Sequence, residues 1–266
     1  MNGSVPSLSI VCMAISCAVS FCLPVILLLY FRKKKGADFL PFFIGCAVML
    51  VFALILEAAV HTVVLATPAG AFIQDHLWLY ALYGGFMAGL FEETGRWIAF
   101  RTVLKHRQDK DANALMYGAG HGGFEAAAIV GVAMINNLVW SVMINSGNSA
   151  AVTDSLTGDT LAQVQQSMQT LVSTPSYQFL LGSVERIFAV AIQISLSVLV
   201  WFSVRRPGRG YLYPAAILLH LIVDAVTVIL SGMGISTILL EAVIGCLAVL
   251  IALLAKGIWK RFTAES

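Results

Sequence analysis

Seven long apolar runs constrain the fold of this 266-residue chain more than any other feature. Each run reaches or exceeds the ~20 apolar residues with which an α-helix crosses the hydrocarbon core of a bilayer. The runs are Leu8–Phe31, Phe39–Ala66, Leu77–Leu104, Ala112–Ile144, Tyr177–Val204, Tyr211–Leu230 and Ile235–Ile258. They predict an all-α, polytopic membrane bundle of about seven transmembrane helices, which forms a single domain over residues 1–266.

The scarcity of charge supports the same prediction. Only 11% of the residues are charged, whereas 59% are hydrophobic, and a soluble domain carries about 25% charged residues. Such a chain could not cover its apolar core with a polar surface in water. We therefore expect a multi-pass protein of the cell membrane, with membrane lipid as a partner. A net charge of +2 gives no sign of nucleic-acid binding.

The placement of basic residues predicts the orientation of the chain. Basic clusters follow the first, third, fifth and seventh runs, beginning with Arg32–Lys35. The opposite loops, Thr67–Asp75, Asn145–Pro175 and Ser231–Gly234, contain no lysine or arginine. Because basic residues concentrate in cytoplasmic loops, the N-terminus is predicted outside and the C-terminus inside. The first run is then a retained anchor, and residues 145–175 form an extracytoplasmic loop in which Thr160–Val172 can form a short amphipathic helix.

Ionisable residues occur inside several of these runs. They are Glu57, His61, Glu92, Glu93, Arg96, His121, Glu125, Glu185, Arg186, His220, Asp224 and Glu241. An ionisable side chain inside the membrane is costly, so each one is a candidate functional residue. At the rise of an α-helix, Glu93, His121 and His220 all lie ~15–18 Å from the cytoplasmic edge. Three separate helices are therefore predicted to bring a glutamate and two histidines to one depth.

Spacing within each helix adds partners at that depth. His121 and Glu125 are four residues apart, as are His220 and Asp224, so each pair shares a helical face. Glu92 and Arg96 have the same spacing and are predicted to form an internal ion pair.

A second group of ionisable residues is predicted farther out. Glu57 and Glu185 lie ~28–30 Å from the cytoplasmic edge by helical rise. With His61 and Arg186 they are expected to form an outer polar layer, in which Arg186 pairs with Glu57 or Glu185. Glu241 is alone on its helix and is expected to serve packing or pairing.

Two chemistries fit the inner cluster. His121, Glu125, His220 and Asp224 are candidate ligands for a divalent metal, since imidazole nitrogen and carboxylate oxygen bind zinc well. In a metal-free site, a glutamate would instead activate water while the histidines stabilise an oxyanion. Hydrolysis is common to both.

Glycines are dense around these residues. Four of them, Gly118, Gly120, Gly122 and Gly123, surround His121. Glycine weakens a helix and also lets two backbones approach closely. The segment is therefore either a kinked or broken helix or a site of close helix packing.

Three short motifs resemble those of known intramembrane proteases. Glu92-Glu93-Thr94-Gly95-Arg96 resembles the EExxR/K signature of the PrsW-like and CAAX-endopeptidase-like proteases. Tyr117 to His121 resembles their aromatic-xxx-His motif, and His220 to Asp224 their HxxxN/D motif. The string from Gly118 to Glu125, with Glu185-Arg186 on a later helix, is most similar to the YhfC family of intramembrane metalloproteases.

The resemblance implies roles for these residues. Glu92 or Glu93 would activate water, and Arg96 would orient the two glutamates. His121, His220 and Asp224 would bind a metal or hold the oxyanion. The CAAX endopeptidases space their motif as EExxxR, with one residue more than here, so the resemblance leaves open which glutamate is the base.

We therefore expect an intramembrane endopeptidase acting on membrane-associated peptides or proteins. One alternative is a transporter or proton relay, because buried histidines and carboxylates also mark ion pathways. The other is a catalytically silent membrane scaffold that uses the polar cluster for helix association.

Overall fold

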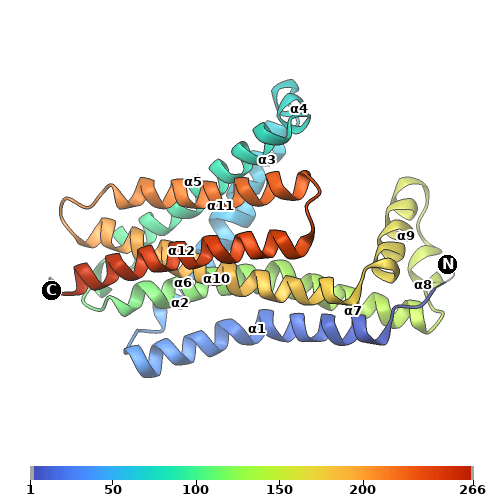
Figure 1. Cartoon of the computed structure of the whole chain (residues 1–266), viewed down its shortest axis with the longest axis horizontal. Coiled ribbons are helices and arrows are strands. Elements are labelled where there is room, and N and C mark those ends of the chain that lie inside the picture. Colours follow the sequence, from blue (N-terminus) through green and yellow to red (C-terminus); the bar gives the residue numbers. More distant parts are fainter. Residues whose placement is uncertain (1–2, 265–266) are drawn as a thin grey trace. The chain divides into compact units, whose positions relative to one another are not determined.

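The computed structural model describes residues 3–264, which are almost entirely helical and include no strand. This confirms the predicted all-α class. The elements in chain order are α1 (Ser7–Lys35), α2 (Leu40–Val48), η1 (Met49–Glu57), α3 (Ala58–Leu65), α4 (Pro68–Gln74), α5 (Leu77–Arg101), η2 (Lys105–Arg107), α6 (Ala112–Ala126), η3 (Ala127–Gly131), α7 (Val132–Asn145), α8 (Ala150–Thr153), α9 (Gly158–Ser173), α10 (Ser176–Arg205), α11 (Leu212–Gly232) and α12 (Thr237–Ala264) (Figure 1).

Six helical stretches within residues 3–264 are long and apolar enough to cross a membrane. They are Ser7–Lys35, Leu40–Leu65, Ala112–Asn145, Ser176–Arg205, Leu212–Gly232 and Thr237–Ala264. Two of these stretches contain a π-helical segment, η1 or η3, between α-helical parts. All six coincide with predicted runs, to within a few residues at each end.

Helix α5 corresponds to the remaining predicted run. Its 25 residues span ~37 Å at 1.5 Å per residue, which exceeds the ~30 Å hydrocarbon core. It does not count among the six because Glu92, Glu93 and Arg96 interrupt its apolar sequence. All three are buried in protein, and α5 packs extensively against α11. The seventh span, and with it the orientation of the termini, stays a prediction.

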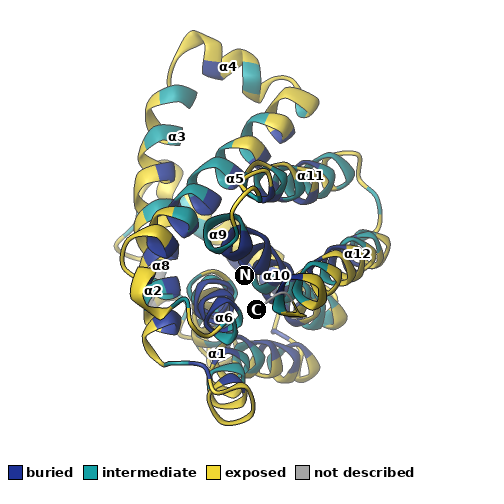
Figure 2. Cartoon of the chain, turned by 90° about the vertical axis from the view of Figure 1, so that its left-hand side faces the viewer, coloured by how far each residue is buried: buried dark blue, intermediate teal, exposed yellow. Residues whose placement is uncertain are grey.

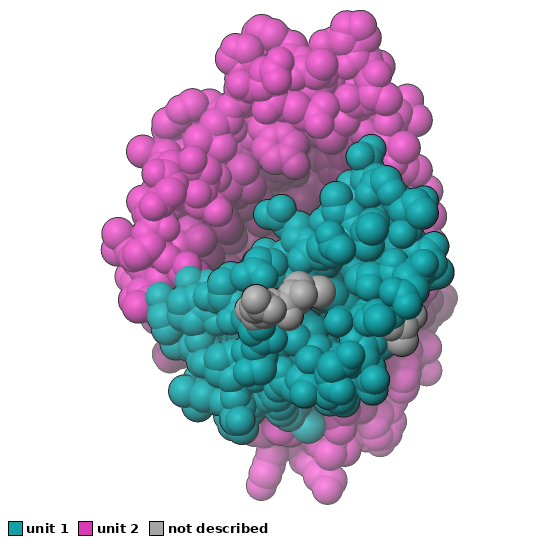
Figure 3. All heavy atoms as spheres, turned by 90° about the vertical axis from the view of Figure 1, so that its right-hand side faces the viewer, with its two compact units in different colours: residues 1–22, 126–186 teal, residues 23–125, 187–266 magenta. Residues whose placement is uncertain are grey.

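The chain divides into two compact units, which Figure 3 shows in different colours. The first comprises residues up to Cys22 together with Ala126–Arg186, and the second comprises Leu23–Glu125 together with the chain from Ile187 onward. In the first unit, α9 confirms the amphipathic helix predicted over Thr160–Val172. Its Met168 and Leu171 are buried, in a core that also contains side chains of α1, α7 and α10.

The core of the second unit lies around the part of α10 that follows Ile187. This part is mostly buried, whereas α3 and α4 are largely exposed (Figure 2). Phe100 of α5 contacts Tyr117 of α6 and Trp201 of α10, with ring centroids 4.7 and 5.0 Å apart. The Trp201 Nε1–H also donates a hydrogen bond of 2.8 Å to Asp111. These contacts fix α5, α6 and α10 against one another.

The glycines around His121 belong to an unbroken helix, α6. A Cβ at Gly120 would lie 2.0 Å from the backbone oxygen of Phe42, and one at Gly118 would lie 2.5 Å from the Cα of Ile194. At the same contact between α2 and α6, a Cβ at Gly45 of α2 would lie 2.3 Å from the backbone oxygen of Tyr117. Of the two interpretations of this segment, close helix packing is therefore confirmed, and the helix is not broken around His121.

The turn between α1 and α2 is held by a carboxylate outside the spans. Asp38 accepts hydrogen bonds from Lys110 at 2.7 Å, from Arg107 at 3.2 Å and from the Asn113 amide at 3.2 Å. Chiefly through the bond from Lys110, these contacts lower the pKa of Asp38 to about 2. The carboxylate therefore remains charged at physiological pH and links this turn to the start of α6.

Candidate active site

Four helices of the second unit bring the predicted inner cluster together. Helix α5 contributes Glu92, Glu93 and Arg96, α6 contributes His121, and α11 contributes His220 and Asp224. Helix α10 adds Gln193. The three helices expected to meet do so, because side chains of α5 contact both histidines directly, while their depth in the membrane stays a prediction.

The carboxylate of Glu92 lies between the two imidazoles. Its Oε2 atom is 2.8 Å from Nε2 of His121 and 3.9 Å from Nε2 of His220. The same oxygen accepts a hydrogen bond of 2.9 Å from the Gln193 amide. No described residue donates a hydrogen bond to the other oxygen, Oε1. Glu92 is thus held in place through one oxygen while the other remains available.

Glu93 has a different environment, since it is fully buried and paired with Arg96. The Arg96 NH1 group lies 2.7 and 2.6 Å from the two oxygens of Glu93, and both side chains have zero exposure. The predicted pairing of Arg96 with Glu92 is therefore wrong. Residues three and four apart are both neighbours on a helix, and here Glu92 turns to His121 and Gln193 instead.

His220 is oriented by Glu93. Its Nδ1 lies 2.9 Å from Glu93 Oε1, which turns the opposite ring nitrogen, Nε2, toward Glu92 and toward Asp224 Oδ2 at 3.5 Å. The Asp224 side chain is 36% exposed, whereas that of His220 is only 7% exposed. Asp224 is therefore the accessible edge of an otherwise buried cluster.

Gln193 connects the cluster and was missed from sequence. Its Oε1 accepts a hydrogen bond from Arg96, and its Nε2 lies 2.9 Å from Glu92 and 3.0 Å from Glu125. A Cβ at Gly122 would lie 2.8 Å from the Cβ of Gln193, so this glycine lets α6 approach α10. Its signal in the sequence is a polar amide inside an apolar run.

The ring of Tyr117 covers one side of the site. It stacks with the His121 ring at a centroid distance of 6.0 Å, and the Arg96 guanidinium lies 5.9 Å from its centroid. The Tyr117 hydroxyl and the His121 Nδ1 are buried and have no hydrogen-bond partner in the part of the chain that the structure describes. The aromatic residue four positions before His121 thus packs directly against the imidazole.

The residues predicted to lie farther out make contacts of their own, but Glu57 also lies close enough to the inner cluster to interact electrostatically with Glu92, His220 and Asp224. Glu57 Oε1 lies 3.0 Å from Nε2 of His61, whose Nδ1 lies 3.0 Å from the Tyr83 hydroxyl. In the first unit Glu185 and Arg186 form an ion pair, as expected.

The four predicted metal ligands do not fit a shared ion in this arrangement. Within residues 3–264, no three His, Cys, Asp or Glu side chains are placed so that they could hold a metal. The contacts explain why. His121 bonds to Glu92 through Nε2, and His220 bonds to Glu93 through Nδ1. Glu125 accepts a hydrogen bond from the Gln193 amide. The two imidazoles are therefore engaged with different glutamates, and Glu125 with an amide, so the four side chains do not converge on one point.

Comparisons with known proteins agree with the sequence motifs. The model of the family described as YhfC intramembrane metalloprotease matches residues 19–245. A protein of Bacillus subtilis (strain 168) named "Uncharacterized membrane protein YhfC" is 40% identical over 214 residues, which cover 80% of this chain and 81% of that protein. No solved structure matches the chain. With its six apolar helices of membrane length, this multi-pass protein of the cell membrane belongs to the YhfC family.

Proposed function

We propose that this protein is an intramembrane endopeptidase that hydrolyses peptide bonds of membrane-associated substrates, with Glu92 as the general base. One observation carries the proposal. The Glu92 carboxylate is held through Oε2 beside His121 and Gln193, while no described residue donates a hydrogen bond to Oε1. A base must accept a proton from water, so it needs a free oxygen within a fixed frame.

Glu93 is less suited to that role. Both of its oxygens bond to Arg96, and its Oε1 also contacts His220. Neither oxygen of Glu93 is therefore free to accept a proton from water. We therefore assign Glu93 and Arg96 to positioning, with Glu93 orienting the His220 ring.

The proposed reaction begins when Glu92 takes a proton from a water molecule. The water oxygen attacks the carbonyl carbon of the scissile peptide, and the carbonyl oxygen becomes an oxyanion. His220, whose Nε2 is directed into the cluster, stabilises that oxyanion as an N–H donor, while His121 holds Glu92 in place through its Nε2. The C–N bond then breaks, and the proton held by Glu92 passes to the leaving amine nitrogen.

The description of the family names a metal, and the donor atoms present do not fit one as arranged. We therefore propose that these residues act without a metal in the reaction step. Metal analysis of the purified protein tests this point, together with cleavage before and after dialysis against a chelator. Activity that is lost on chelation and restored by zinc would overturn the metal-free proposal while leaving the peptidase proposal intact.

Cleavage of membrane-spanning peptides by the purified chain tests the main proposal. Glu92→Gln should lower kcat by about 10²–10⁴-fold, as expected for loss of a general base. Glu185→Gln is the matched control, because it removes a carboxylate from a span but lies outside the cluster. If Glu92→Gln stays folded and cleaves at the wild-type rate, Glu92 is not the base. If the wild-type chain cleaves nothing but moves protons or solutes across proteoliposomes, it is a transporter.

A further inference from the structure

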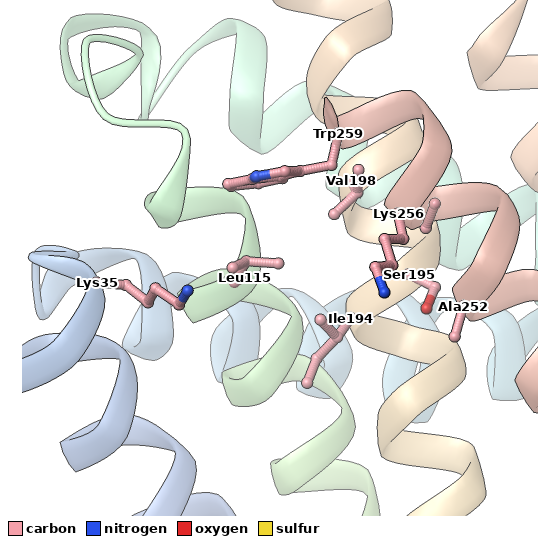
Figure 4. A pocket seen from close by; sticks show the side chains of 9 residues that line it. Lys35, Leu115, Ile194, Ser195, Val198, Ala252, Lys256 and Trp259 are labelled. Carbon is pink, nitrogen blue, oxygen red and sulfur yellow. The ribbon is translucent and has the colours of Figure 1, made fainter. Parts of the chain in front are cut away.

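A cavity of about 250 Å³ lies in the second unit, away from the inner cluster. It is bounded by the end of α1, the start of α6, the middle of α10 and the last turns of α12 (Figure 4). Most of its lining is apolar and includes Leu115 of α6, Ile194 and Val198 of α10 and the Trp259 ring of α12. A cavity of this kind suits hydrocarbon better than a polar solute.

Two lysines flank this apolar space. Lys35 and Lys256 extend into it from α1 and α12, on opposite sides in the view of Figure 4. Neither ammonium has a hydrogen bond or an ion pair with another side chain among residues 3–264. Some neighbouring cations are paired, as Arg32 is with Asp38 and Arg205 with Asp111. The cavity therefore combines an apolar lining with two unmatched positive charges.

The position of the cavity along the spans matches that of lipid headgroups. Lys35 ends α1, whose last turn is Arg32–Lys35, and Lys256 lies two turns before the end of α12. Basic residues and tryptophan at the ends of spans lie at the level of the headgroups. Here Trp259 supplies the indole, with its ring centroid 6.0 Å from that of Phe202.

We propose that this cavity binds an anionic phospholipid. The headgroup phosphate lies between the ammonium groups of Lys35 and Lys256, and the first part of an acyl chain lies against Leu115, Ile194 and Val198. Basic pockets between transmembrane helices bind anionic headgroups in this way. The volume of about 250 Å³ is below the usual ~300–1,000 Å³ of a small-molecule site, so most of each acyl chain remains in the bilayer. The proposal is independent of the proposed peptidase activity.

Native mass spectrometry of the full-length chain tests the proposal. The chain is titrated in detergent at 150 mM salt with phosphatidylglycerol or phosphatidylcholine. We expect one phosphatidylglycerol per chain to be retained in preference to phosphatidylcholine. The double variant Lys35→Gln/Lys256→Gln should bind it about 25-fold more weakly, which corresponds to about fivefold per lysine near an anionic lipid.

Two further variants separate a built site from general surface charge. Lys34→Gln/Lys260→Gln removes the same charge from the same two helices but outside the cavity lining, and should weaken binding by about threefold or less at this ionic strength. Ala252→Trp fills the cavity and should abolish retention although both lysines remain. Circular dichroism and thermal melting confirm that each variant is folded.

Several outcomes would overturn the proposal. Equal weakening by the two lysine pairs would show only surface attraction, and equal retention of phosphatidylcholine would show that charge is not recognised. Displacement of the lipid by ~10 mM inorganic phosphate, which has no acyl chain, would show that the site binds anions in general and does not recognise the lipid. Preferential retention of an acidic peptide over the lipid would identify a different class of partner.

Discussion

At the residue scale, the adjacent carboxylates of Glu92 and Glu93 on α5 have different surroundings. Glu92 lies beside two imidazoles and an amide, whereas Glu93 is matched by the guanidinium of Arg96. The residue types and their convergence could be predicted from sequence, because ionisable residues inside apolar runs are conspicuous. The choice of partners could not, because Arg96 can reach either glutamate along the helix. That choice is set by Gln193 and His121, which come from other helices.

The environment of Glu93 leads to a prediction about stability. Its ion pair with Arg96 has no exposure to solvent, so Glu93→Ala leaves an uncompensated buried guanidinium. Loss of one partner of a buried pair costs about 3–5 kcal/mol, and the free energy of unfolding should fall by that amount. Thermal and denaturant melts in detergent measure it. The double variant Glu93→Ala/Arg96→Met should recover much of the loss, and a Glu93→Ala protein of wild-type stability would contradict the assigned pairing.

Gln193 allows a second prediction, which concerns positioning. Gln193→Leu keeps the approximate size of the side chain but removes the bonds to Glu92, Glu125 and Arg96. We expect kcat to fall about tenfold to hundredfold with little change in KM, because only the orientation of the base is disturbed. Ser195→Ala on the same helix is the control, since the Ser195 hydroxyl bonds only to a backbone oxygen of α10. An unchanged kcat in Gln193→Leu would remove Gln193 from the site.

At the element scale, glycines determine how closely the helices that carry the site approach. Gly45 and Gly120 place α2 against α6, and Gly85 and Gly89 place α5 against α11. A Cβ at Gly89 would lie 2.8 Å from the backbone oxygen of Ile217. Sequence indicated dense glycine but not which helix each one faces. It likewise gave no sign of the π-helical segment η1, because hydrophobic runs look alike in α- and π-helices.

The prediction at the element scale compares the stability of two variants, each with alanine in place of a glycine inside a helix. Gly120→Ala places a Cβ 2.0 Å from the Phe42 backbone oxygen, so α2 and α6 must separate, at a cost of about 3 kcal/mol or more. Gly84→Ala meets nothing within 4 Å and should be neutral or stabilising by about 0.5–1 kcal/mol, as alanine favours a helix. Melting temperatures of the two variants test this, and equal temperatures would refute the close approach of the helices.

At the scale of the whole molecule, the number of spans and the side of each terminus depend on each other. Six helical stretches qualify by length and composition, and an even number of spans would leave both termini on one side. An odd number is required for the predicted N-terminus outside and C-terminus inside. The number of spans and the side of each terminus therefore both depend on α5, whose charged side chains are buried against protein rather than exposed to lipid. Composition could not settle this, because it does not show which face of a helix contacts protein.

We predict that α5 spans the membrane. A buried ionisable cluster is tolerated inside a bilayer when it faces the protein interior, and the two ends of α5 differ in charge in the expected sense, with no lysine or arginine in Thr67–Asp75 and a basic loop from Lys105. Single cysteines at Asp75 and Lys105, both exposed, are placed in a chain whose five cysteines are replaced by alanine. A membrane-impermeant maleimide applied to intact cells should label residue 75 but label residue 105 only after lysis. Labelling of both from the same side would establish that α5 does not cross, and the termini would then share one side of the membrane.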